Sequence, residues 1–245
     1  MRGKAYLYRH VGAQHTLMAQ QIRANNLANV NTAGFRADFE RVSAYALAGD
    51  GYPSRVMARE ELAGTDFKAG ALMQTGRKLD VAIRGEGFIT VQTADGKEAY
   101  TRAGNLESDA DGLLTLNGRP VLGEGGEMVL PAYRDLSFGK DGSLSITPPG
   151  GGARLDVGRL KLVNPDPAEL VKGPDGLFRL RQGGDAEASE QVVLASGFLE
   201  GANVNAVDEL ISSMSLTRNF ELQVKLMKTA DDQARQGARL ISGQG

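Results

Sequence analysis

The stretch Ala24-Asn25-Asn26-Leu27-Ala28-Asn29-Val30-Asn31-Thr32-Ala33-Gly34-Phe35-Arg36 decides how this chain can be organised. It closes a run of helical periodicity, yet it holds four asparagines within seven residues. Asparagine side chains compete for backbone hydrogen bonds, so their presence in a helix needs a reason. Asn25 and Asn29 share a helix face with Met18 and Ile22, which favours a helix–helix seam whose register an amide fixes. A frayed helix end followed by a polar turn is the alternative interpretation.

Helical periodicity is present at both ends of the chain. Apolar residues recur at three- and four-residue steps from Ala5 to Val30, and again from Asn203 to Ile241. About 35 residues at a rise of about 1.5 Å span about 50 Å, more than a small β domain needs. We therefore expect the two helices to pair in a coiled-coil-like bundle, within the chain and with neighbouring subunits. The residues expected at this subunit interface are Leu7, Val11, Met18, Ile22, Asn25, Asn26, Asn29, Val207, Ile211, Met214, Phe220, Val224 and Met227.

Between the helices, the sequence predicts antiparallel β structure from Ala71 to about Phe198. Short, alternating apolar segments are separated by Asp-Gly and Asn-Gly pairs, which supply the positive φ that tight hairpins need. These pairs are Asp95-Gly96, Asp111-Gly112, Asn117-Gly118, Asp141-Gly142 and Asp175-Gly176. The strands expected between them are Leu79–Arg84, Phe88–Gln92, Glu98–Arg102, Leu113–Leu116, Leu144–Ile146, Leu155–Val163 and Gly176–Leu180.

The predicted fold class is α+β, with an antiparallel β-rich central domain flanked by long N- and C-terminal helices. The expected boundaries are residues 1–34 for the N-terminal helix, 35–70 for an extended linking arm, 71–200 for the β-rich domain and 201–245 for the C-terminal helix. The signal in the arm is weak, apart from a loop at Gly49-Asp50-Gly51-Tyr52-Pro53. We expect residues 71–198 to fold alone, because narrow, Ala-rich helical stripes gain most of their stability from packing.

Composition excludes several classes of function. The formal net charge of the 245 residues is −2, so no basic field attracts nucleic acid. The chain has no Cys, which excludes disulfides and thiolate metal sites, and no Trp. Arginine and lysine residues interrupt any apolar signal-peptide core near the N-terminus, and no run of 18 apolar residues predicts a transmembrane helix.

Motifs that carry chemistry in other proteins are incomplete in this sequence. Gly85-Glu86-Gly87 follows an apolar strand, but a third glycine and a following helix are missing, so nucleotide binding is not expected. The acidic stretch Asp109-Ala110-Asp111 lacks the EF-hand spacing and fits a hairpin turn better. His10 and His15 are five residues apart and do not share a helix face as a metal pair would. We expect no catalytic residues, cofactor or metal, although a carboxylate pair in the β region stays open.

Three groups of motifs, in order along the chain, resemble the flagellar rod and hook family of axial proteins. The first is the opening stretch from Ala24 to Arg36. The second begins with Thr75-Gly-Arg-Lys-Leu-Asp-Val-Ala-Ile-Arg-Gly-Glu-Gly-Phe-Ile-Thr-Val91 and continues with Tyr100-Thr-Arg-Ala-Gly-Asn-Leu106. The third is Leu199-Glu-Gly-Ala-Asn-Val-Asn-Ala-Val-Asp-Glu-Leu-Ile211. A segment of the C-terminal helix, Thr217 to Asp232, resembles the proximal-rod member in particular.

The resemblance implies a structural subunit of the proximal rod, which forms the axial drive shaft of the flagellum and transmits torque. The terminal helices would form the axial core of the rod, with the β domain outside. The implied partners are other proximal and distal rod subunits, copies of the same chain and the flagellar export apparatus. The implied location is the basal body, where the rod spans the periplasm after export without a cleaved signal peptide. No nucleic acid, small-molecule substrate or transmembrane segment is expected.

Other classes of protein remain as alternatives. A distal-rod or hook-type subunit would carry most of the same motifs. A periplasmic adaptor also combines long helices with β domains, but its helical hairpin lies in mid-chain. A carbohydrate-binding or hydrolytic β protein usually exposes aromatic side chains, and this chain lacks Trp.

Overall fold

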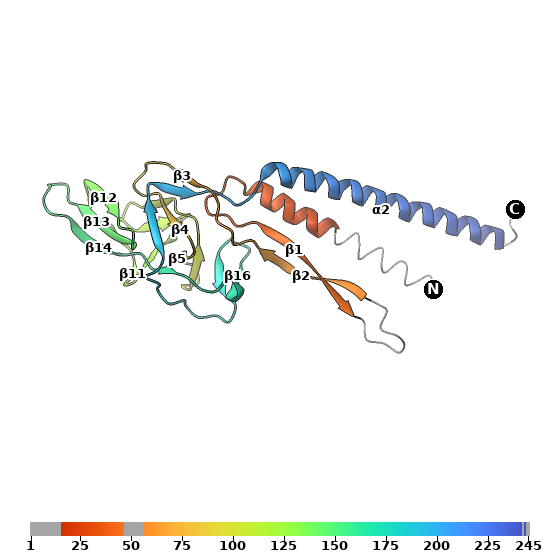
Figure 1. Ribbon diagram of the computed structural model, residues 1–245, viewed down its shortest axis with the longest axis horizontal. Coiled ribbons are helices and arrows are strands. Elements are labelled where there is room, and N and C mark those ends of the chain that lie inside the picture. The colour runs from red at the N-terminus through yellow and green to blue at the C-terminus, as the bar shows by residue number, and fades with distance from the viewer. Residues whose placement is uncertain (1–15, 47–55, 242, 244–245) are drawn as a thin grey trace. The chain divides into compact units, whose positions relative to one another are not determined.

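The computed structural model describes residues 16–46, 56–241 and 243 (Figure 1). The chain divides into two compact units, which we call unit 1 and unit 2. Unit 1 contains residues 1–28, 38–65 and 204–245, and unit 2 contains residues 29–37 and 66–203. The chain therefore passes from one unit to the other four times, and each unit is built from separate segments of sequence.

Unit 2 is β-rich, as the sequence predicts, and its paired strands are antiparallel. Its largest sheet has the order β15-β5-β6-β17-β16, and two three-stranded sheets have the orders β12-β13-β14 and β7-β8-β9. The strands are β3 (Leu72–Gln74), β4 (Val81–Arg84), β5 (Phe88–Gln92), β6 (Glu98–Thr101), β7 (Leu106–Ser108), β8 (Leu114–Leu116), β9 (Arg119–Pro120), β10 (Leu122–Gly123), β11 (Gly126–Glu127), β12 (Asp135–Phe138), β13 (Ser143–Thr147), β14 (Leu155–Arg159), β15 (Leu162–Val163), β16 (Leu170–Lys172), β17 (Phe178–Leu180), β18 (Val193–Ser196) and β19 (Phe198–Glu200), with a 3-10 turn η1 (Pro167–Glu169).

The predicted hairpin turns are confirmed. The five Asp-Gly and Asn-Gly pairs connect β5 to β6, β7 to β8, β8 to β9, β12 to β13 and β16 to β17, and each of these strand pairs is hydrogen-bonded. The glycine of each pair has positive φ, and among the described residues Asn117 is the one non-glycine residue that shares this conformation, at φ 51°. The predicted strand Leu155–Val163 is interrupted, because Leu160 leaves β14 to form an isolated bridge with Gly123.

The core of unit 2 is formed by apolar side chains that alternate along these strands. Alternate residues of β13, Leu144 and Ile146, are completely or almost completely buried, whereas their neighbours are half-buried. A second cluster contains Phe88, Phe178 and the half-buried Phe67, whose rings lie 5.3–6.3 Å apart. Aromatic pairs at this separation add to the stabilisation that burial alone provides.

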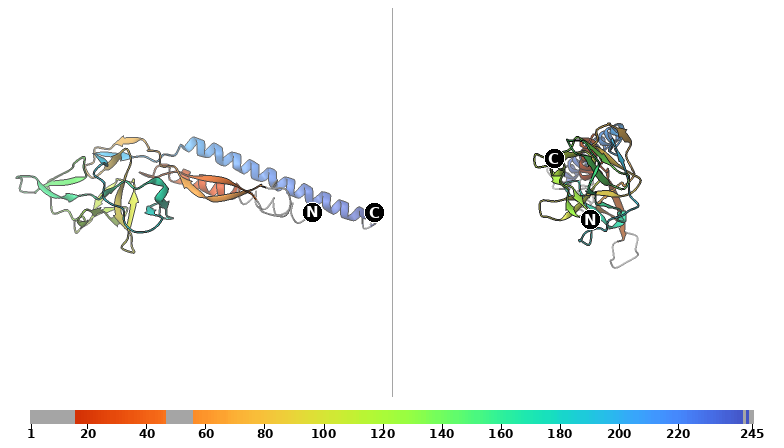
Figure 2. Two further views of the ribbon diagram at one scale, coloured as in Figure 1. Left: turned by 60° about the horizontal axis from the view of Figure 1, so that its bottom comes forward. Right: turned by 90° about the vertical axis from the view of Figure 1, so that its left-hand side faces the viewer.

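Unit 1 contains a helix, a β-hairpin and a second, longer helix. The first helix covers residues 16–28 of the described chain. The hairpin pairs β1 (Asp38–Ala46) with β2 (Val56–Thr65), so the segment expected to be an extended arm contains two paired strands. The helix α2 (Ala206–Ile241) has 36 residues, and Figure 2 shows it as one uninterrupted helix. Within the described residues, no helix is long and apolar enough to cross a membrane.

The predicted fold class is wrong about the helices. A long N-terminal helix paired with the C-terminal helix in a bundle is not found in the described residues, where the N-terminal helix ends at residue 28. The chain then turns and enters unit 2, as residues 29–37. Part of the physical reason lies at Asn26, one of the residues that the sequence predicted at the interface between helices. Its side chain binds the backbone of Asp38, at the start of β1, through both its oxygen and its nitrogen, and it also binds Glu209 of α2, so the first helix contacts a strand as well as α2.

Candidate assembly surface

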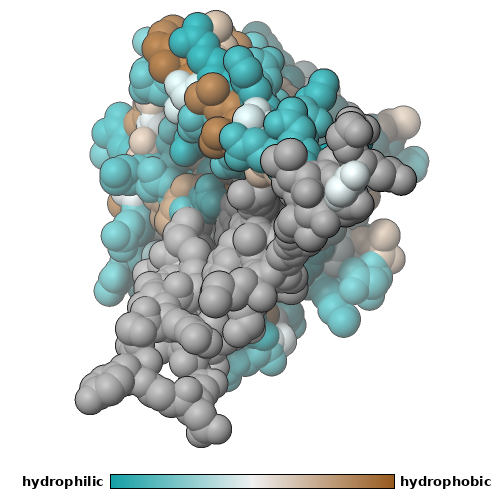
Figure 3. Space-filling model, turned by 90° about the vertical axis from the view of Figure 1, so that its right-hand side faces the viewer, coloured by the Kyte–Doolittle hydropathy of each residue, from teal (hydrophilic) through white to brown (hydrophobic). Residues whose placement is uncertain are grey.

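The helix α2 exposes a row of large apolar side chains near its N-terminal end. Val207, Leu210, Ile211 and Met214 are 62%, 49%, 58% and 59% exposed. At about 100° per residue they fall within a sector of about 100° on the helix surface. We call these four residues the α2 apolar row. In the view of Figure 3, hydrophobic residues lie in small groups among hydrophilic ones.

The opposite side of α2 is partly covered. Glu209 is buried, and Leu216, Phe220 and Met227 are half-buried. These four residues lie roughly 180–220° around the helix from Val207. The sequence placed Phe220 and Met227 on one stripe with Val207, but each step of three residues falls about 60° short of a full turn. Successive three-residue steps therefore carried the predicted stripe from one side of the helix to the other.

The structure distributes the predicted interface residues among different environments. In the N-terminal helix Met18 and Ile22 are half-buried, Asn25 is exposed and Asn26 is fully buried, and Asn29 is half-buried in the turn that follows. In α2, Val207, Ile211, Met214 and Val224 are exposed. Leu7 and Val11 lie outside the described residues. The role of this set in contacts between subunits stays a prediction. Sequence analysis missed Leu210. Its spacing could have indicated it, because Leu210 lies three residues after Val207 and four residues before Met214.

Asn26 joins three elements of unit 1. Its Nδ2 donates to the carbonyl oxygen of Asp38 at 2.9 Å and to Oε1 of Glu209 at 3.1 Å, and its Oδ1 accepts from the Asp38 amide at 3.0 Å. Arg23 Nη1 lies 3.1 Å from Glu209 Oε1 and balances its charge. The amide thus links the first helix to β1 and to α2, and all its hydrogen-bonding atoms have partners.

A second polar cluster lies in unit 2, around Glu200. One carboxylate oxygen accepts from Arg36 Nη2 at 2.6 Å and from the Gly70 amide at 2.8 Å, and the other accepts from Arg102 Nε at 2.8 Å. Arg36, Arg102 and Glu200 are only 1–4% exposed. Burial lowers the pKa of Arg102, and Glu200 opposes that shift by stabilising the charged guanidinium. Removing one member of such a buried group costs about 3–5 kcal/mol, because a charge is left uncompensated.

Sequence analysis included these residues in its motifs but did not predict their pairing. Arg36 and Glu200 are separated by 164 positions. Because local periodicity carries no information about partners this distant, no signal in a single sequence identifies the ion pair.

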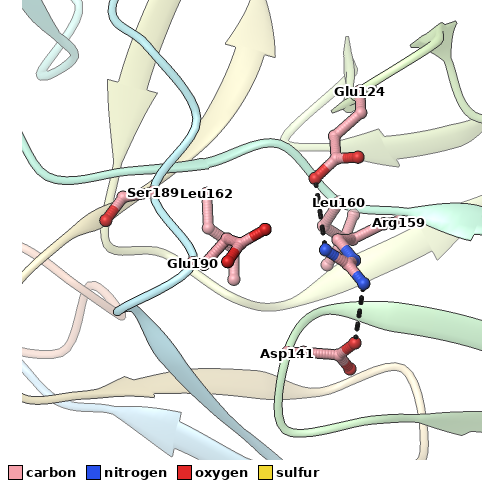
Figure 4. A pocket seen from close by; sticks show the side chains of 7 residues that line it. All are labelled: Glu124, Asp141, Arg159, Leu160, Leu162, Ser189 and Glu190. Carbon is pink, nitrogen blue, oxygen red and sulfur yellow. Dashed lines mark hydrogen bonds and ion pairs between the residues drawn. The ribbon is translucent and has the colours of Figure 1, made fainter.

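A small pocket in unit 2 is lined by charged side chains (Figure 4). It has a volume of about 240 Å³, and Arg159 lies between two carboxylates, 3.1 Å from Asp141 and 3.7 Å from Glu124. Glu190 lines another side of the pocket. These ion pairs are half exposed, so each contributes little to stability. Among the described residues, no group of three or more His, Asp or Glu side chains could hold a metal ion.

Comparisons with known proteins identify the family. Three family models match: the flagella basal body rod protein at residues 7–36, the flagellar hook protein FlgE/F/G D1 domain at residues 82–146, and the flagellar basal body rod FlgEFG protein C-terminal at residues 195–240. The flagellar basal-body rod protein FlgF of Escherichia coli is 38% identical, over 96% of this chain and 98% of that protein. FlgF of Salmonella typhimurium is 37% identical over the same shares. FlgG of Buchnera aphidicola is 31% identical, over 88% of this chain and 92% of that protein.

The chain therefore belongs to the family of flagellar basal-body rod proteins. It is a structural subunit of the proximal rod, with FlgF among its relatives. The predicted resemblance is confirmed, and family membership excludes the periplasmic-adaptor and carbohydrate-binding alternatives.

Proposed function

We propose that this subunit acts mechanically, by assembling with copies of itself and with other rod subunits into a shaft that transmits torque. It needs no cofactor and catalyses no reaction in this role. The observation that carries the proposal is the α2 apolar row. Fully burying a large apolar side chain contributes about 1.5–3 kcal/mol, and each of these side chains is about half exposed or more. Exposed apolar patches of this kind mark interaction sites in soluble proteins.

Charged residues flank the α2 apolar row. Asp208, Arg218, Glu221 and Lys225 are exposed on the same helix, and they include both signs of charge. An apolar centre with a polar rim is the usual composition of a protein–protein interface. The opposite charges would select the register in which neighbouring helices meet, because like charges brought together are repelled.

The location of the subunit follows from its membership of the rod family. We propose that the rod crosses the periplasm and that the flagellar export apparatus delivers the subunit without cleavage of a signal peptide. Its neighbours would be other proximal and distal rod subunits. The relatives are named as basal-body rod proteins, which supports the basal body as the site of action.

Ile211→Lys tests the proposed assembly surface. In the free subunit the lysine is solvated, so the free energy of unfolding should change by less than about 0.5 kcal/mol. In an assembled rod the ammonium would be buried without a partner, at a cost of several kcal/mol. We expect at least about a tenfold loss of the chain from purified basal bodies, together with non-motile cells.

The matched control is Asn219→Lys, which adds the same charge at an exposed position of α2 outside the apolar row. This variant should assemble normally. Normal motility of the Ile211→Lys strain would contradict the proposal that the α2 apolar row is buried by neighbouring subunits. A large loss of stability in the purified Ile211→Lys chain would show instead that Ile211 belongs to the core of its own subunit.

A further inference from the structure

Three of the places where the chain passes between the two units are joined by hydrogen bonds within unit 2. Ala37, Asp66 and Asn203 are the unit 2 residues at these passages. The Asp66 amide donates to the carbonyl oxygen of Ala37 at 2.8 Å. Asn203 Oδ1 accepts from the Ala37 amide at 2.7 Å, and Asn203 Nδ2 donates to the Asp66 carbonyl at 2.8 Å. The three residues thus form a closed ring.

The side chain of Asn203 is the only one that takes part in closing this ring. Its Nδ2 makes a second bond, to the carbonyl oxygen of Lys68 at 3.0 Å, so both amide protons are used. Its backbone amide also donates to the carbonyl oxygen of Phe35 at 3.3 Å. No other residue type of this size offers one acceptor and two donors together. Aspartate keeps the shape but would place a carboxylate against two carbonyl oxygens.

Glu200 lies three residues before Asn203, and it also connects its own segment to the segments around Arg36 and Gly70. Its backbone carbonyl accepts from the Gly34 amide at 2.8 Å, and its carboxylate binds Arg36 and the Gly70 amide. The segments 34–37, 66–70 and 200–203 are therefore joined at two levels, by the side chains of Asn203 and Glu200. We call this arrangement the passage clamp.

We propose that Asn203 is a positioning residue. It makes the three segments at the passages open together under force, rather than one at a time. The proposal rests on the mechanical role proposed above, because only a subunit that transmits torque needs to share load among its chain segments. A force that enters unit 2 along one segment is distributed by the passage clamp to the other two. Hydrogen bonds loaded side by side then share the force that would otherwise break each of them in turn.

Hydrogen exchange on the purified full chain tests the cooperative part of the proposal. Asn203→Asp removes both amide donors, and Asn203→Ala removes the side chain without adding charge. The matched control is Asn105→Asp, because the exposed Asn105 amide makes a similar bond to Asn117 Oδ1 at 3.1 Å in the same unit. We expect exchange in residues 34–37, 66–70 and 200–203 to quicken together, by about tenfold, in both Asn203 variants and not in the control. Faster exchange confined to one of the three segments, or unchanged exchange in all of them, would overturn the proposal.

Swimming speed in media of rising viscosity tests the mechanical part. At equal amounts of chain in purified basal bodies, the Asn203→Asp strain should lose speed more steeply with viscosity than the Asn105→Asp strain. Parallel loss in the two strains would show that the passage clamp has no mechanical role. If the wild-type chain were itself absent from basal bodies, the proposed function would fail, whereas the exchange experiment would still decide whether the three segments open together.

Discussion

Gly34 shows why the motif from Ala24 to Arg36 requires glycine at one position. Its φ is +68°, and a Cβ atom there would lie 2.2 Å from the backbone of Arg102 and Ala103. The sequence predicts the positive φ, because glycine commonly follows a helix end. It does not predict the close approach of a second backbone, which comes from a distant part of unit 2. The close contact explains the glycine more completely than the turn does.

Gly34→Ala should therefore destabilise the protein by more than a positive φ alone explains. A left-handed backbone costs a non-glycine residue about 1–2 kcal/mol. The clash with backbone atoms, which cannot rotate away, should raise the total to at least about 4 kcal/mol. Denaturant unfolding of the purified variant measures this loss.

Gly118→Ala is the control for backbone conformation. Gly118 has φ +75°, but a Cβ there would meet nothing within 4 Å. We expect this variant to lose only about 1–2 kcal/mol. Equal losses in the two variants would show that the backbone near Arg102 moves aside, and that packing does not explain Gly34.

The burial of Tyr100 should make the stability of unit 2 depend on pH in the alkaline range. Its side chain is fully buried, and burial raises its pKa to about 12 from an ordinary value of 10.0. The folded state holds the phenolic proton more tightly than the unfolded state, so the stabilising contribution is complete below pH 10. As the pH rises from about 10 to about 12, the protein should lose roughly 2–3 kcal/mol through this group.

Tyr100→Phe isolates this effect. The Tyr100 hydroxyl accepts a hydrogen bond from the Ala186 amide at 2.6 Å, so the variant should be about 1–2 kcal/mol less stable near pH 9. Because phenylalanine does not ionise, the difference between the two proteins should shrink as the pH rises above 10 and reverse in sign near pH 12. A constant difference over that range would mean that Tyr100 does not titrate in the unfolding reaction.

At the scale of elements, the sequence predicted the hairpins of unit 2 well and the helix contacts poorly. Asp-Gly and Asn-Gly pairs determine hairpin turns through local backbone preferences, and such preferences can be recognised in one sequence. The partner of a helix depends on contacts between residues far apart in the chain. Asn26 illustrates this limit, because an amide on a helical stripe fits a helix–helix seam and a strand backbone equally well. In the structure the amide contacts both the backbone of Asp38 in β1 and the carboxylate of Glu209 in α2.

Asn26→Ala should loosen the junction of the first helix, β1 and α2. It leaves the Asp38 amide and carbonyl without their partner and removes a donor from Glu209. We expect a loss of about 2–3 kcal/mol in the free energy of unfolding and faster hydrogen exchange at Asp38. Gln21→Ala, at an exposed position on the same helix, should change stability by less than about 0.5 kcal/mol. Similar losses in the two variants would count against the junction.

At the scale of the whole molecule, each of the two units is built from segments that are not consecutive in the sequence. The sequence predicted one folding region between two helical ends, because periodicity changes near residues 71 and 198. The predicted domain boundaries stay a prediction, and the contacts describe unit 2 as residues 29–37 and 66–203. The buried Glu200 lies within the predicted β-rich domain of residues 71–200 but beyond the segment 71–198 that was expected to fold alone. Arg36 lies before both, and it packs in unit 2 with Glu200. Periodicity identifies elements, and it does not report which distant segments share a core.

Three fragments should therefore differ in thermal stability in a defined order. Residues 29–203 contain all of unit 2 and should unfold cooperatively. Residues 66–203 lack Arg36 and the Gly34 amide, so Glu200 keeps Arg102 but loses two partners. A loss of about 3 kcal/mol should lower the melting temperature by about 10 °C. Residues 71–198 also lack Glu200 and leave Arg102 as a buried guanidinium without a carboxylate, which should lower stability further.

Circular dichroism melting curves of the three fragments test this order. Arg102→Met in the 71–198 fragment is the decisive control, because it removes the uncompensated charge while keeping an apolar chain of similar length. If the missing carboxylate is the cause, this substitution should restore part of the lost stability, since a buried ion pair replaced by apolar groups is often no less stable. Equal melting temperatures for the three fragments would show that unit 2 folds without its N-terminal segment. The first helical motif would then serve unit 1 alone.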